Sequence, residues 1–87
     1  MTDKQILFLL GVLKSEYENS YKDFDTVVAT WKSLFKDDDY DLTSRAVKRY
    51  IETNTTGFKP TIGQIKDLAK QIRREEWDAK QREQDLL

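Results

Sequence analysis

The chain has 87 residues, and its 15 Lys and Arg side chains almost balance its 16 Asp and Glu side chains, which leaves a net charge of −1. Because it contains no Cys and no His, the sequence excludes disulfides, zinc sites built from those ligands, and catalysis by a thiolate or an imidazole. A chain of this length forms one small domain, and its two charge signs are interspersed, unlike the basic patch typical of strong nucleic-acid binders.

The first predicted helix runs from about Asp3 to Glu18. Thr2 and Gln5 have the spacing of a capping box, in which two side chains satisfy backbone N–H groups at a helix start. Its apolar run is far shorter than the roughly 20 residues that cross a bilayer, so we expect no membrane span and a cytoplasmic protein. The residues expected to face the core recur at helical spacing: Ile6, Leu9, Leu10, Leu13 and Tyr17.

Two further helices are predicted in the middle of the chain. Asp23 or Asp25 can cap the second, and Trp31 is expected in the core because it lies inside an apolar stripe. Asp38 or Asp39 can cap the third. The apolar face of the second helix comprises Phe24, Val27, Val28, Trp31, Leu34 and Phe35, and that of the third comprises Tyr40, Leu42, Ala46, Val47, Tyr50 and Ile51.

A fourth helix is expected to begin sharply at Ile62. Pro60 disfavours helical dihedrals in the residue before it, and Thr61 with Gln64 forms a second capping box. Its inner stripe contains Ile62, Ile65, Leu68, Ala69 and Ile72. The stripe has no adequate continuation after Ile72, although the residues that follow favour helix. We therefore predict an all-α fold, with a small bundle of three helices plus a fourth whose end projects or frays: residues 1–72 form the bundle domain, and residues 73–87 form a charged helix extension or flexible tail.

The sequence does not indicate a catalytic, cofactor or metal site. Three glycines cannot build a phosphate-binding loop. The acidic run that starts at Asp37 has Leu42 where an EF-hand loop needs Gly, so we interpret it as a solvated, helix-capping turn. Glu75 and Glu76 are adjacent and are expected to belong to a solvated face. We therefore expect a non-enzymatic protein that carries no cofactor.

Basic residues form a stripe on the fourth predicted helix, to which Arg45, Lys48 and Arg49 are candidates to add. Nearby acids dilute this stripe, so an ordinary exposed face is favoured over a DNA-binding surface. Trp77 lies off the apolar stripe and is flanked by charges, which leaves two alternatives: it folds back onto the bundle, or it anchors a partner. The candidate partner-binding residues are Lys66, Lys70, Arg73, Arg74 and Trp77.

Three segments together resemble the loader and inhibitor proteins of replicative DNA helicases encoded by phages and prophages of Gram-positive bacteria. They are "WKSLFKDDDY" from Trp31, "AVKRYI" from Ala46 and "FKPTIGQI" from Phe58, and the resemblance covers roughly residues 7–69. It implies a folded helical domain followed by a flexible C-terminal segment that engages the hexameric helicase. It also implies that the protein keeps the helicase inactive and delivers it to an origin-bound replication protein.

The sequence thus predicts a phage replication adaptor whose partner is a replicative DNA helicase. Nucleic acid is not expected to be its main partner, and no membrane is involved. Two alternatives belong to other classes: a small phage DNA-binding or replisome-organising module that uses the basic stripe, and a phage inhibitor of a host protein.

Overall fold

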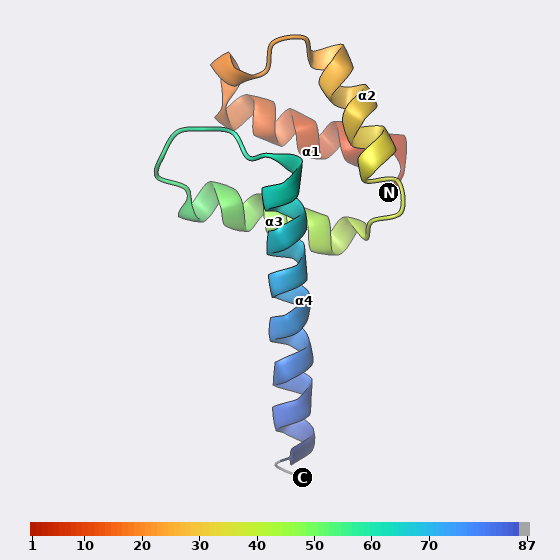
Figure 1. Ribbon diagram of the computed structural model, residues 1–87, viewed down its shortest axis with the longest axis vertical. Helices are drawn as coiled ribbons and strands as arrows, with labels where there is room; N and C mark the ends of the chain where they lie inside the picture. The colour runs from red at the N-terminus through yellow and green to blue at the C-terminus, as the bar shows by residue number, and fades with distance from the viewer. Residues whose placement is uncertain (86–87) are drawn as a thin grey trace.

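The computed structural model describes residues 1–85 and contains four α-helices and one short 3₁₀ helix (Figure 1). No strand occurs within these residues, so the predicted all-α fold is confirmed. The elements are α1 (Asp3–Glu16), η1 (Glu18–Ser20), α2 (Phe24–Leu34), α3 (Tyr40–Thr53) and α4 (Ile62–Asp85). None of these helices is both long enough and apolar enough to cross a membrane.

Both predicted capping boxes are present. At the start of α1, the Gln5 backbone N–H donates to the Thr2 hydroxyl (3.2 Å), and the Thr2 N–H donates to the Gln5 side chain (2.9 Å). Thr61 and Gln64 make the same reciprocal pair, so α4 begins at Ile62 as predicted. The first helix ends two residues earlier than expected, because Tyr17 leaves helical dihedrals and the chain turns through η1.

The aspartates at the other two helix starts have different roles. Asp39 caps α3, since its carboxylate accepts the Leu42 N–H at 2.9 Å. Asp23 precedes α2, but it has a left-handed backbone (φ 53°), and its carboxylate accepts the Thr26 hydroxyl instead of a backbone N–H. The expected side-chain cap of the α2 backbone by Asp23 is therefore absent.

The core lies between α1, α2, α3 and the first half of α4. Trp31 is 4% exposed and packs on Phe35, with ring centroids 4.5 Å apart, so its predicted core position is confirmed. Leu34 is 50% exposed and contradicts the predicted face of the second helix, because it lies at the edge of that stripe in the last turn. The buried apolar residues are Ile6, Leu9, Leu10, Leu13, Tyr21, Trp31, Phe35, Ala46, Val47, Tyr50, Ile65 and Ile72.

The fourth helix leaves the bundle and projects from it (Figure 1). Its first half packs across α3, where Ile65 and Ile72 are buried and Ile62, Leu68 and Ala69 are partly buried against the core. Its 24 residues correspond to about 36 Å of helix at 1.5 Å per residue. The helix continues unbroken past Ile72 to Asp85, and residues 86–87 of the predicted tail lie outside the described residues.

Candidate functional site

Two interhelical ion pairs hold α4 against α3 beyond the last buried apolar residue. The Arg49 guanidinium donates to both carboxylate oxygens of Glu75, at 3.1 and 2.9 Å. Arg45 donates to Glu76 and also, at 2.7 Å, to Asp41 on its own helix. Glu75 and Glu76 were expected to be a merely solvated face, and the structure corrects that expectation because both reach across to α3.

These pairs also change the electrostatic character of the predicted basic stripe. The hydrogen bond from Arg45 lowers the pKa of the Glu76 carboxyl below its ordinary value. Arg45 and Arg49 are therefore neutralised by α4 and do not extend its basic stripe. Lys48 does not extend it either, since it pairs with Glu52 (3.9 Å) on α3 itself.

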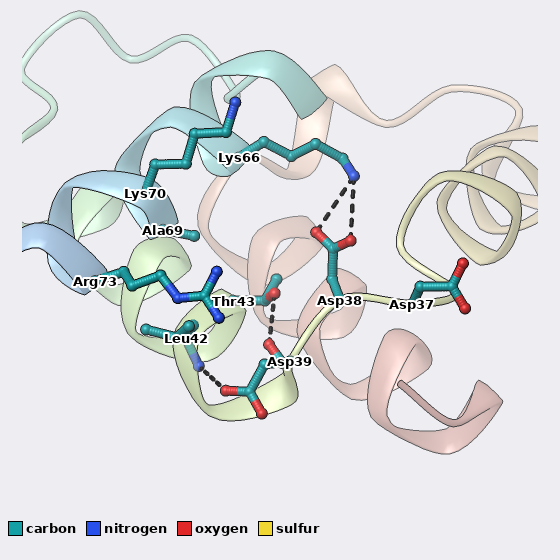
Figure 2. A pocket seen from close by; sticks show the side chains of 9 residues that line it. All are labelled: Asp37, Asp38, Asp39, Leu42, Thr43, Lys66, Ala69, Lys70 and Arg73. Carbon is teal, nitrogen blue, oxygen red and sulfur yellow. Dashed lines mark hydrogen bonds and ion pairs between the residues drawn. The ribbon is translucent and has the colours of Figure 1, made fainter.

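Lys66, the first of the candidate residues, ties α4 to the loop between α2 and α3. Its ammonium donates to the Leu34 carbonyl oxygen at 2.7 Å and to both oxygens of Asp38 at 3.3 Å (Figure 2). The same ammonium lies 4.8 Å from the centre of the Phe35 ring, within the range of a cation–π contact. The interactions of Lys66 thus lie within the fold, and the residue is only partly accessible to a partner.

A groove of about 430 Å³ separates the acidic turn from α4. Asp37, Asp38 and Asp39 form one wall, and Lys66, Lys70 and Arg73 line the other together with apolar side chains. In Figure 2, Lys70 points away from the aspartates. Because both signs of charge line the groove, it favours neither an anion nor a cation. Within the described part of the chain, no group of three acidic side chains is placed to hold a metal ion.

The remaining candidates lie together on the outward side of α4. Lys70, Arg73, Arg74 and Trp77 follow one another at spacings of three, one and three residues, which places them on one side of a helix. All four are exposed, and the three cations form no ion pair with any described residue. The structure therefore brings four of the five predicted residues together, with Lys66 at the bundle end of the same side.

Trp77 is 63% exposed and does not fold back onto the bundle. It lines a shallow hollow on the surface of α4 together with Arg73, Arg74 and Asp78. Of the two alternatives for this residue, the structure supports the accessible one. We call the set Lys70, Arg73, Arg74 and Trp77 the outer face of α4.

Sequence reasoning missed the three long-range ion pairs that α4 makes with the rest of the bundle. A usable signal existed for two of them: Arg45 and Arg49 are four residues apart on one helix, and two acids follow directly where the apolar stripe of the other helix ends. The pairing of Lys66 with Asp38 had no such local signal.

Comparison with known protein families identifies one match. Residues 1–66 match the family model for the N-terminal domain of the gene-39 protein, a helicase-binding protein of phages. The matched region covers α1, α2, α3 and the first turn of α4, and the outer face of α4 lies beyond it. No curated protein and no solved structure shows significant similarity to the chain.

Proposed function

Because the chain belongs to the phage helicase-loader and inhibitor family represented by this N-terminal domain, we propose that it is a non-enzymatic adaptor of phage DNA replication. It binds a hexameric replicative DNA helicase, holds the helicase inactive and loads it at the origin. An origin-bound replication protein is its second partner. It acts in the cytoplasm of a Gram-positive bacterial host.

The observation that carries this proposal is the exposed Trp77 on the projecting half of α4. A tryptophan that is 63% exposed and flanked by Arg73 and Arg74 has the composition of an interface hot spot, in which Trp and Arg are enriched. The unpaired cations around it complement an acidic patch on the helicase and accelerate the encounter with it. The outer face of α4 is therefore the proposed helicase contact, and Lys66 contributes by fixing the direction of the helix.

The ion pairs between α3 and α4 prepare this surface for binding. Arg49 with Glu75 and Arg45 with Glu76 hold the helix up to the residue before Trp77. A helix that is already formed loses less conformational entropy on binding than a disordered segment does. The bundle thus positions the outer face, and the partner has to order little more than side chains.

Inhibition by such an adaptor needs no catalytic group. A ligand shifts a conformational equilibrium only by its difference in affinity for the two states. In this proposal, the adaptor binds the inactive state of the helicase more tightly than the active state. Release at the origin then follows when a second partner competes for the adaptor or for the helicase.

Point substitutions on the outer face test the helicase contact. Trp77→Ala should weaken binding to the purified helicase by about 2 kcal/mol or more, which is roughly 30-fold, if Trp77 is a hot spot. The matched control is Phe58→Ala, which removes another exposed aromatic side chain, 74% exposed, from the loop between α3 and α4. Isothermal titration calorimetry measures both. Equal affinities for Trp77→Ala and the parent chain would remove Trp77 from the interface.

A second candidate function is favoured by the three cations that have no ion-pair partner among the described residues. Lys70, Arg73 and Arg74 are positioned for phosphate contacts in a DNA-binding or replisome-organising module. Three such contacts to duplex DNA give a slope of about −2.7 for the logarithm of the binding constant against that of the salt concentration. A salt titration by fluorescence anisotropy separates the functions, because the adaptor function predicts no DNA binding with this slope.

A further inference from the structure

The helix α1 is apolar on two opposite sides, and only one of them faces the core. Ile6, Leu9, Leu10 and Leu13 are buried. On the other side, Phe8 is 62% exposed and Leu7 is 43% exposed. A helix that is hydrophobic all round is normally buried all round. The second side of α1 thus lacks the cover that its composition predicts within residues 1–85.

This exposed surface continues from α1 onto α3. A shallow hollow on α1 is lined by Leu7, Phe8, Gly11, Val12, Ser15 and Glu16. An adjoining groove between the helices is lined by the apolar side chains of Phe8, Val12, Val47 and Ile51, with Lys48 and Glu52 also on its walls. We call this combined surface the α1/α3 face. A contiguous apolar surface with a polar rim is the usual mark of a protein–protein interaction site.

Gly11 in the middle of α1 is not explained by the fold. A glycine inside a helix costs up to about 1 kcal/mol relative to alanine. A Cβ atom added at Gly11 would meet nothing within 4 Å, so no neighbour in this chain requires its absence. Gly11 leaves a notch one helical turn from the exposed ring of Phe8. Such a notch allows the close approach of a helix from outside.

We propose that the α1/α3 face binds the same face of a second copy of this chain, which makes a two-fold symmetric dimer with the two α1 helices antiparallel. A symmetric interface must be self-complementary. The projecting ring of Phe8 and the notch at Gly11 lie side by side on this face, so each copy offers a knob and a hole to the other.

The charges on the face obey the same symmetry. An antiparallel pairing that sets Phe8 against Val12 of the second copy also sets Lys4 against Glu16 of the second copy. On α3, Lys48 and Glu52 lie at equal distances in sequence from the middle of the groove, so the same axis brings each toward its opposite in the other copy. Oppositely charged pairs on both helices therefore match a second copy, whereas a partner of one charge sign would meet repulsion at half of them.

This inference does not depend on the proposed helicase contact. None of the residues that line the α1/α3 face belongs to α4. A dimer formed through this face therefore leaves the outer face of α4 to be tested separately.

Sedimentation equilibrium of the full chain tests the dimer. The average mass should rise from that of one chain toward two between about 10 µM and about 1 mM, because a face of this size supports a weak complex. Phe8→Asp should remain monomeric over the same range, since it places a charge in the apolar contact. The matched control is Phe58→Asp, which should associate like the parent chain. Thermal unfolding of each variant verifies that it is folded.

Charge reversal distinguishes a second copy from any other occupant. A chain with Lys4→Glu and Lys48→Glu and a chain with Glu16→Lys and Glu52→Lys should each self-associate at least tenfold more weakly than the parent. An equimolar mixture of the two should regain the parent's association, since opposite charges then meet across the axis. A parent chain that stays monomeric up to about 1 mM, or Phe8→Asp that associates like the parent, would overturn the proposal. Charge variants that associate equally well alone and mixed would overturn it too.

Discussion

Trp31 is the residue on which most of the core depends. It is 4% exposed and packs against Phe35. Replacing a buried aromatic residue by alanine costs about 3–5 kcal/mol, and small domains have about 5–15 kcal/mol in total. Trp31→Ala should therefore lose most of its stability in urea denaturation, whereas Trp77→Ala should stay within about 0.5 kcal/mol of the parent. A loss below about 1 kcal/mol for Trp31→Ala would contradict its core position.

Tyr21 makes stability depend on alkaline pH. Burial, reinforced by Tyr17 and Tyr50, raises the pKa of the Tyr21 hydroxyl to about 12. In the unfolded chain the same group ionises near pH 10. Between these two values ionisation favours the unfolded state, so the contribution of Tyr21 is fully present below about pH 10 and falls as the pH rises toward 12.

Urea denaturation across this pH range measures the effect. Tyr21→Phe should lose less stability than the parent chain between about pH 10 and about pH 12, because it has no hydroxyl to ionise. In the folded parent, the ultraviolet absorbance of tyrosinate should show a late step that the variant lacks. Identical pH profiles for the two chains would contradict the burial of this hydroxyl.

At the level of single residues, local patterns predict burial better than they predict pairing. The helical spacing around Trp31 is sufficient to place it in the core. The choice between Asp38 and Asp39 as the cap of α3 was open, because either carboxylate can accept a backbone N–H. The structure assigns the cap to Asp39 and leaves Asp38 to Lys66. That pair joins residues 28 positions apart, and no local pattern contains such information.

Among the elements, α4 shows most clearly what apolar periodicity can and cannot predict. Its start at Ile62 and the end of its apolar packing at Ile72 both follow from the sequence. The turn after Ile72 also contacts α3, through Glu75 and Glu76. Periodicity counts only apolar residues, and this contact depends on how α3 and α4 cross, which the sequence does not state. The projecting helix was predicted, and its ionic attachment was not.

Two truncations separate this attachment from the rest of α4. A chain that ends at Glu76 keeps both interhelical ion pairs and should unfold at nearly the same temperature as the full chain. A chain that ends at Ile72 loses both pairs and should be destabilised by about 0.4–2 kcal/mol, since exposed pairs contribute about 0.2–1 kcal/mol each. Thermal and urea denaturation measure the difference. Equal stability of the two truncated chains would show that the ion pairs contribute nothing measurable.

Viewed as a whole, the molecule separates folding from recognition. The buried residues lie in α1, α2, α3 and the part of α4 up to Ile72, together with Tyr21 and Pro60 between helices. The outer face of α4 begins at Lys70, where the helix leaves the bundle (Figure 1). This division lets the two surfaces be changed without unfolding the domain. It also supports an adaptor, which presents one helix to a partner and needs no enclosed site.

The most direct test of this account is the binding of the replicative helicase to the chain that ends at Glu76. That chain keeps the bundle, the capping box at Thr61 and both ion pairs, but it lacks Trp77 and everything after it. Isothermal titration calorimetry against the purified hexamer should show tight binding of the full chain and a loss of at least about 30-fold for the truncated chain. Equal affinities for the two chains, with the truncated chain folded, would contradict the account.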